Sequence, residues 1–216
     1  MCGICGYWDL NLKLGANTSI VELMASKINH RGPDGQGTWH DLSSGVAFGH
    51  RRLSIVDLSS AGAQPMTSHS GRHTIVFNGE IYNHDAIRNE LNASLGGKII
   101  WKGYSDTETL LISIEQWGIE KALTRCVGMF AFAVWDNLDG TLHIARDRFG
   151  EKPLYYGFQG KTFLFGSELK ALRVHPFFQA EINRKALGLF LRYNYVPAPH
   201  CIYKGIHKLP PGSYMR

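Results

Sequence analysis

The sequence lacks the features that would place a protein in a membrane or direct it through one. Its longest apolar run, Val127 to Trp135, is nine residues long, whereas a helix needs about 20 apolar residues to cross a bilayer. No basic stretch followed by an apolar stretch precedes Cys2, so no secretory signal is predicted. We therefore expect a cytoplasmic protein that does not contact a membrane.

Cysteine is scarce, and its spacing disfavours a structural metal site. The four cysteines are Cys2, Cys5, Cys126 and Cys201. A zinc site with Cys2 and Cys5 would need a second pair at short spacing, but Cys126 and Cys201 lie far apart. A thioredoxin-like C-x-x-C would need a strand before it. We expect no metal, which leaves two interpretations of Cys2. It is an ordinary buried residue, or it becomes the first residue of the chain.

A concentrated patch of positive charge is also missing. The net charge is +5, but the basic residues are scattered and the densest short cluster is His50-Arg51-Arg52. The sequence shows neither a helix-turn-helix pattern nor an aromatic-basic RNA motif. Nucleic-acid binding is therefore not predicted.

The patterns that are present predict a mixed α+β domain. The chain of 216 residues shows no repeat, low-complexity segment or linker. Prolines predict that roughly the last 20 residues are extended. Alternation and β-rich composition predict strands at 4–8, 46–48 and 74–77, and an antiparallel meander at 129–135, 142–145, 154–158 and 162–165. Helical periodicity predicts helices beginning near Ser19 and Ser105, one through Ile87 and Leu91, and two more at 168–172 and 184–192.

Several short stretches carry polar residues whose ordinary interpretation is structural. Arg52 in GHRRLSIVD is typical of a solvated surface charge, and Asp106 in YSDTE suits a helix start. Asn78-Gly79 in FNGEIYN follows a β-rich run and, taken alone, predicts a hairpin turn. Glu80 would then be an exposed acid. Each stretch by itself is a weak signal of function.

Together with MCGICG and NHRGPDGQG, these stretches resemble the class II glutamine amidotransferase domain, an N-terminal-nucleophile hydrolase. The match continues through GMFAFAVWD, ARDRFGEKPLYYG, FGSELKAL and KLPPGSY, and so covers nearly the whole chain. The RGPD and NGEIYN motifs resemble those of the glutaminase domain of glutamine-hydrolysing asparagine synthetases. Glucosamine-6-phosphate synthases and phosphoribosyl-pyrophosphate amidotransferases share the Cys start and the Asn-Gly pair.

The resemblance implies a role for each of eight residues. Cys2 would be the nucleophile, forming a thioester after Met1 is removed. The Asn78 side chain and the Gly79 N–H would form the oxyanion hole. Substrate-binding roles go to Arg52 for the α-carboxylate, Asp106 with Glu80 for the α-ammonium, and the backbone of Ile55 and Val56 for the pocket wall.

The position of Cys2 also has a physical rationale. An α-amine has a pKa of about 7.7–8.0, against about 10.4 for lysine, so much of it is neutral near pH 7. The amine of an N-terminal cysteine can therefore accept the proton of its own thiol, without a separate histidine. Cys5 would be a packed residue of the first strand.

The resemblance further implies a fold, partners and cofactors. The fold would be an αββα four-layer sandwich, with residues 1–216 forming one glutaminase domain. No Ser-Gly-Gly-x-Asp-Ser loop occurs, so the ATP-binding synthetase domain is expected to be absent from this chain. The glutaminase domain itself would need no cofactor. ATP and Mg²⁺ would be bound by the synthetase domain. The partners would be L-glutamine and an ammonia-accepting synthetase domain in cis or trans, and a homodimer is kept as a possible assembly.

Three other functions stay open at this stage. The chain could be the glutaminase domain of another amidotransferase, serving sugar or natural-product biosynthesis. It could be a catalytically silent regulatory domain, against which the full residue set argues. It could also hydrolyse a different amide, although Arg52 and Asp106 favour an α-amino acid.

Overall fold

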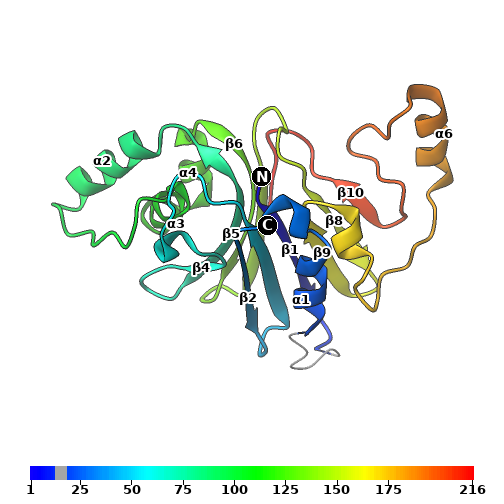
Figure 1. Cartoon of the computed structure of the whole chain (residues 1–216), viewed down its shortest axis with the longest axis horizontal. Coiled ribbons are helices and arrows are strands. Elements are labelled where there is room, and N and C mark those ends of the chain that lie inside the picture. Colours follow the sequence, from blue (N-terminus) through cyan, green and yellow to red (C-terminus); the bar gives the residue numbers. More distant parts are fainter. Residues whose placement is uncertain (13–18) are drawn as a thin grey trace.

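Two antiparallel sheets lie face to face at the centre of the molecule, with helices on both outer faces (Figure 1). The computed structural model describes residues 1–12 and 19–216. The six-stranded sheet has the order β10-β8-β9-β1-β3-β2, and the five-stranded sheet has the order β11-β7-β6-β5-β4. The strands are β1 (Gly3–Asp9), β2 (Gly35–Asp41), β3 (Val46–Arg52), β4 (Met66–Thr67), β5 (His73–Ile81), β6 (Gly128–Asp136), β7 (Thr141–Arg146), β8 (Tyr155–Gln159), β9 (Thr162–Gly166), β10 (Ile206–Lys208) and β11 (Tyr214–Met215).

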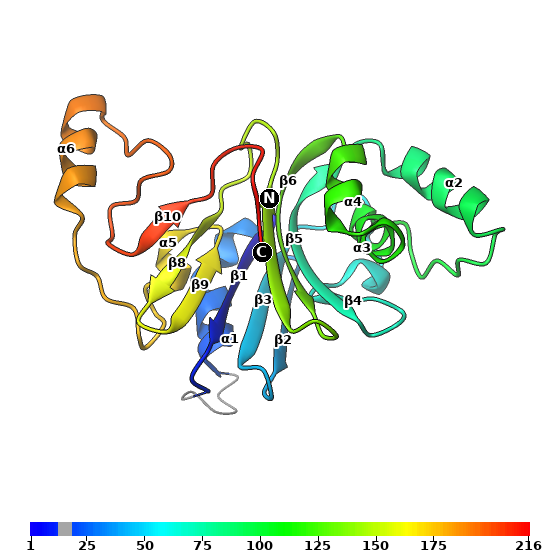
Figure 2. The same cartoon turned by 180° about the vertical axis from the view of Figure 1, so that it is seen from behind.

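The helices divide between the two outer layers. Helices α2, α3 and α4 lie on the side of the five-stranded sheet, and α1 and α5 lie on the side of the six-stranded sheet (Figures 1 and 2). Helix α6 stands at the far edge, beyond β10. The helices are α1 (Ser19–Ser26), α2 (His84–Ser94), α3 (Asp106–Trp117), α4 (Ile119–Arg125), α5 (Leu169–Leu172) and α6 (Arg184–Tyr193), with short 3₁₀ turns η1 (Asn29–Arg31) and η2 (Ser60–Gly62). Within the described residues, no helix is long and apolar enough to cross a bilayer.

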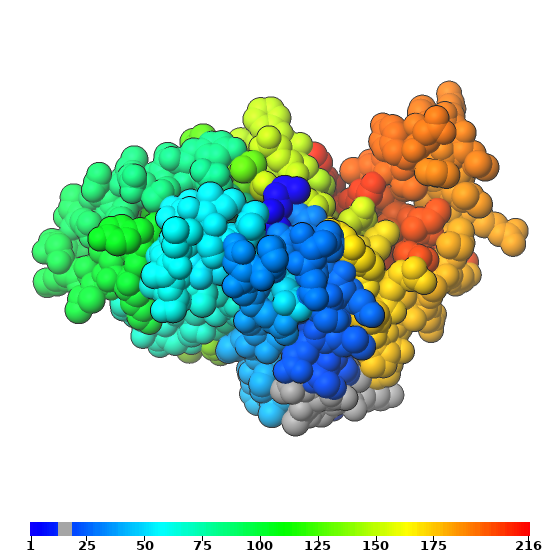
Figure 3. All heavy atoms as spheres, viewed as in Figure 1, coloured from blue at the N-terminus to red at the C-terminus, as the bar shows by residue number. Residues whose placement is uncertain are grey.

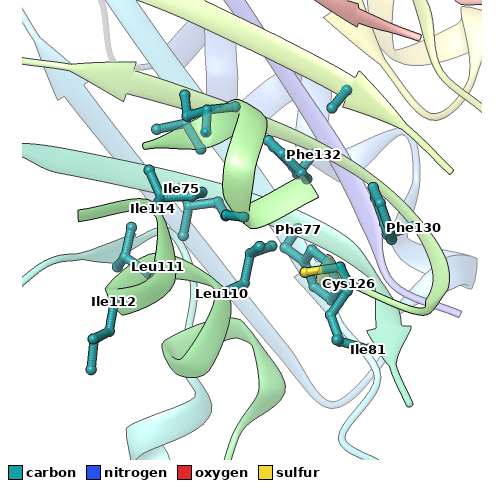
Figure 4. Close-up of a cluster of buried hydrophobic side chains, with 14 of the residues drawn as sticks. Ile75, Phe77, Ile81, Leu110, Leu111, Ile112, Ile114, Cys126, Phe130 and Phe132 are labelled. Atoms are coloured by element: carbon teal, nitrogen blue, oxygen red, sulfur yellow. The ribbon is translucent and has the colours of Figure 1, made fainter. Parts of the chain in front are cut away.

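Three buried clusters correspond to the three interfaces between four layers. Ile4, Phe48 and Val76 belong to the cluster between the two sheets. A second cluster packs α1 and α5 on the six-stranded sheet. The third packs α3 and its neighbours on the five-stranded sheet, where Figure 4 shows Phe77 beside Cys126. The predicted αββα sandwich is therefore confirmed.

Alternation along each strand decides which layer a side chain enters. On β1, Ile4 points between the sheets, whereas Cys5 points toward the α1 layer and is fully buried there. The prediction that Cys5 is a packed strand residue is confirmed. On β5, Val76 points between the sheets while Phe77 points toward the helices. Asn78 follows the same alternation, so its side chain points between the sheets.

Two sequence predictions were wrong about the sheets. The predicted meander is split, because β6 and β7 belong to the five-stranded sheet while β8 and β9 belong to the six-stranded one. Asn78-Gly79, taken alone, predicted a hairpin turn, but both residues lie inside β5 and pair with Ala131 and Phe130 of β6.

Several further elements were missed, among them β2 and α4. Strand β2 carries Gly35 and Gly37 and has no apolar alternation, because it is an edge strand paired only with β3. Helix α4 has only seven residues and begins directly after Gly118, whose φ is +79°. The predicted helix start at Ser105 is confirmed, since its hydroxyl accepts a hydrogen bond from the Glu108 N–H at 3.2 Å.

Candidate active site

The eight residues singled out in the sequence line one pocket of about 110 Å³. The pocket lies where the beginning of β1, the end of β3, the end of β5 and the beginning of α3 meet. Figure 3 shows the first residues of the chain, in dark blue, reaching the surface between the light-blue and yellow-green segments. The residues are Cys2, Arg52, Ile55, Val56, Asn78, Gly79, Glu80 and Asp106.

The Cys2 thiol is held against the backbone that follows β3. Its Sγ accepts a hydrogen bond from the Leu53 N–H at 3.3 Å and lies 3.5 Å from the Leu53 carbonyl oxygen, to which it can donate. Burial raises the pKa of Cys2, outweighing the Leu53 N–H and the positive charges nearby. The resting thiol therefore keeps its proton near pH 7, and a base is needed before the sulfur can act as a nucleophile.

Arg31 contacts the Cys2 backbone, and the sequence reasoning assigned it no role. Its Nε donates to the Cys2 carbonyl oxygen at 2.9 Å, and its Nη1 donates to Glu168 at 2.9 Å. Arg31 lies in the NHRGPDGQG stretch, so the available signal was the motif itself. The contact shows that this stretch reaches the Cys2 backbone from η1.

The Asn78 side chain is a buried donor that the protein leaves unused. Asn78 is 1% exposed, and its Nδ2 makes no hydrogen bond to any residue that the structure describes. Buried polar groups in folded proteins are nearly always paired, so an orphan donor in a pocket indicates a place for a ligand acceptor.

The ladder hydrogen bonds show which way the Gly79 N–H points. Gly79 faces Phe130 across β5 and β6. The Phe130 N–H and C=O are both engaged by Asp147, at 3.2 and 2.8 Å. Gly79 is therefore at a non-hydrogen-bonded position of the ladder, and its N–H points away from β6.

Two neighbours on β5 point their N–H groups to the same edge. The Phe77 N–H donates to Gln64 at 2.7 Å, and the Ile81 N–H donates to Asp106 at 2.9 Å. The Gly79 N–H lies between them on the pocket side. The glycine itself has a second explanation, because a Cβ there would lie 2.3 Å from the Met129 carbonyl oxygen. Glycine at 79 therefore lets β6 approach β5.

Arg52 is the last residue of β3 and is not a free surface charge. Its Nη1 donates to the Ser59 carbonyl oxygen at 2.9 Å, and its Nη2 donates to the Asp57 carbonyl oxygen. The guanidinium thereby fixes the loop that carries Ile55 and Val56, which are 64% and 39% exposed. A guanidinium has five N–H donors, so these two bonds leave donors for a ligand.

Asp106 opens α3 and is 5% exposed. Its carboxylate accepts hydrogen bonds from Ile81 and Thr107, both at 2.9 Å. Burial raises its pKa, with those two bonds opposing the shift. Its place at a helix start also agrees with the ordinary structural interpretation.

Opposite charges act on the thiol from within the pocket. The Arg52 charge lowers the pKa of Cys2 and the Asp106 charge raises it, although burial is the larger effect. Glu80 on β5 is half-buried beside them. A ligand that carries both an anionic and a cationic group would match this distribution.

Lys152 is a further pocket residue that the sequence reasoning missed. It is 5% exposed, and its Nζ lies 3.4 Å from the Met1 sulfur. The only sequence signal was its place within ARDRFGEKPLYYG. Within residues 1–12 and 19–216, no group of three or more His, Cys, Asp or Glu side chains is arranged to hold a metal ion.

Comparison with known proteins identifies the family. A model of the glutamine amidotransferase domain matches residues 1–216. Asparagine synthetase [glutamine-hydrolyzing] 3 of Bacillus subtilis is 39% identical over 214 residues, which are 98% of this chain and 34% of that protein. Amidase chry2 of Gibberella zeae is 31% identical over 224 residues, covering 100% of this chain and 32% of that protein. The chain thus spans about a third of the length of these curated relatives.

A solved structure shares the fold. Glutamine phosphoribosylpyrophosphate amidotransferase from B. subtilis, complexed with ADP and GMP, has a TM-score of 0.65 at 23% identity, covering 80% of this chain and 43% of that chain. This likeness agrees with the predicted fold class. The family match confirms the resemblance drawn from the sequence motifs.

Proposed function

This chain belongs to the family of glutamine amidotransferase domains, and on that premise we propose that it hydrolyses L-glutamine to glutamate and ammonia through a thioester on Cys2. The observation that carries the proposal is the pocket in which a thiol, an unpaired amide donor and two opposite charges meet. A purified sample should release ammonia and glutamate from L-glutamine in equal amounts. Failure to do so would favour a silent regulatory domain.

The proposed chemistry needs only protein groups and water. The α-amine of Cys2 takes the thiol proton, Sγ attacks the side-chain carbonyl carbon, and the oxyanion receives hydrogen bonds from the Asn78 amide and the Gly79 N–H. The amine then returns the proton to the departing ammonia, and water hydrolyses the thioester. No cofactor takes part in this scheme, so we expect the glutaminase rate to be unchanged by EDTA.

Removing the oxyanion donor should slow the chemical step. Asn78→Ala is expected to lower kcat by about 10²–10³, because the donor acts on charge that develops in the transition state. The KM for glutamine should change much less. Steady-state kinetics measure both constants, and circular dichroism checks the fold. A variant with wild-type kcat would show that Asn78 is not an oxyanion donor.

Removing Arg52, the proposed partner of the substrate α-carboxylate, should weaken substrate binding. Arg52→Ala is expected to raise the glutamine KM by about 10–150-fold, the loss of a charge-assisted hydrogen bond of about 1.5–3 kcal/mol. Arg51→Ala is a matched control, because the neighbouring Arg51 donates to the Ala25 carbonyl oxygen. An effect of Arg52→Ala on kcat alone, with KM unchanged, would contradict the assignment.

The destination of the ammonia is a separate proposal. The asparagine synthetases among the relatives support an ammonia-accepting synthetase domain, in cis or trans, with ATP and Mg²⁺ serving that domain. A sugar or natural-product acceptor, the alternative that the sequence left open, stays the second candidate. The chain is proposed to work in the cytoplasm, where its four free thiols stay reduced. A homodimer stays a prediction that light scattering can check.

A further inference from the structure

The proposed nucleophile needs external support for its backbone. Once Met1 is removed, Cys2 has no peptide bond on its amino side, so its own backbone rotation is restrained only by later residues and by side chains. The contact of Arg31 Nε with the Cys2 carbonyl oxygen, at 2.9 Å, supplies such a restraint. A residue that fixes the Arg31 side chain therefore also restrains the position of the Cys2 thiol and α-amine.

Glu168 holds Arg31. The Arg31 Nη1 donates to Glu168 Oε1 at 2.9 Å, and the two side chains are 9% and 25% exposed. His30 and Lys170 contact the same carboxylate, at 2.9 and 3.0 Å. Burial opposes ionisation of Glu168, but these three partners outweigh it and lower the pKa to about 2. The carboxylate is thus charged across the working pH range.

Ser167 holds the next part of the strand from the same side. Its Oγ accepts a hydrogen bond from the Ile4 N–H at 3.0 Å, and its own N–H donates to the Ile4 carbonyl oxygen at 2.9 Å. Ser167 is fully buried. Gly3 lies between the residues that make these contacts, and a Cβ added to Gly3 would lie only 3.1 Å from Arg31 Cδ. The Arg31 stem therefore packs closely against the backbone that links Cys2 to Ile4.

We propose that Ser167 and Glu168 are positioning residues that clamp the start of β1, so that the thiol and α-amine of Cys2 are held in the geometry required for glutamine hydrolysis. The inference rests on the proposed function for its catalytic consequence. A displacement of about 1 Å at a reacting group can cost about 10²-fold in rate. Neither residue lines the substrate pocket, so the clamp acts through Cys2 and not through glutamine.

The test begins with Glu168→Gln, which keeps the shape of the side chain and removes its charge. We expect kcat to fall by about 10–100-fold, while the glutamine KM stays within about two-fold because Arg52 and Asp106 are untouched. Lys170→Ala is the matched control, since it removes another partner of Glu168 and leaves the Arg31 contact in place. It should keep kcat within about two-fold of wild type.

A second measurement follows the thiol without using glutamine. Iodoacetamide labelling of Cys2, read by peptide mass in samples with matched N-termini, should be about three-fold faster or more in Glu168→Gln, because a loosened Cys2 is less buried. Equal labelling rates in variant and wild type would overturn the clamp, as would the same change in Lys170→Ala. If wild type hydrolyses no glutamine, the proposed function fails and the labelling rates alone decide the clamp. If Glu168→Gln does not fold, Ser167→Ala and Arg31→Lys carry the same comparison.

Discussion

Cys2→Ala is expected to abolish glutamine hydrolysis and to leave the fold intact. The thioester cannot form without Sγ, and among the described residues no second cysteine lines the pocket. The structural cost is small, because the lost contacts are the two weak hydrogen bonds to Leu53 at 3.3 and 3.5 Å, worth about 1 kcal/mol or less. The rate of ammonia release and the thermal unfolding temperature measure the two effects.

Cys5→Ala is the matched control for this variant. Cys5 lies three residues later, is fully buried toward α1, and has its pKa raised to about 12 by burial. Its loss should lower stability and keep kcat. A glutamine-like electrophile, diazo-oxo-norleucine, should label Cys2 once in wild type. Label on Cys126 or Cys201 alone, or a wild-type rate in folded Cys2→Ala, would show that the nucleophile is misassigned.

The sequence was most informative where one local rule determines the structure. Ser105 caps α3 because a hydroxyl can accept from the N–H three residues later, and this pattern is visible in the letters Ser-Asp-Thr-Glu. The strand at Ile4 and Cys5 was visible as a short apolar run. The pocket residues were visible because their motifs resemble a family, and the structure brings all eight together.

The sequence was less informative where the structure depends on contacts distant in the chain. Strands β7 and β8 follow one another in the chain but belong to different sheets, because β9 and its neighbour β8 join the sheet in which β1 lies between β9 and β3. Local alternation does not encode this arrangement. Asn78-Gly79 has turn chemistry, but β6 approaches so closely that glycine is needed inside the strand. Arg31 reaches the Cys2 carbonyl across 29 residues of chain, so no local pattern could assign that role.

The second large effect concerns the amino end of the chain. Protein that retains Met1 is expected to hydrolyse glutamine about 10²–10⁴ times more slowly than protein that begins at Cys2, the usual effect of losing a general base. With Met1 attached, the Cys2 nitrogen is an amide that cannot accept a proton near neutral pH. Because burial raises the pKa of the thiol, little thiolate forms without a base.

Met1 would also occupy the site itself. In the structure Met1 lines the pocket, and the buried Lys152 ammonium lies 3.4 Å from its sulfur. The residue therefore stands where substrate would approach Cys2. Lys152→Ala in protein that keeps Met1 would remove this contact and leave the amide, so it should not restore the rate if the missing base is the dominant loss.

The measurement compares one preparation before and after removal of a cleavable N-terminal tag that leaves Cys2 first. Intact mass confirms each amino end, and circular dichroism confirms that both samples are folded. The same tag at the C-terminus, on protein that begins at Cys2, controls for bulk and should have little effect. Equal glutaminase rates before and after cleavage would show that the α-amine is not the base. The reason for a cysteine at position 2 would then lie in its packing against Leu53, and the N-terminal-nucleophile mechanism would not apply to this chain.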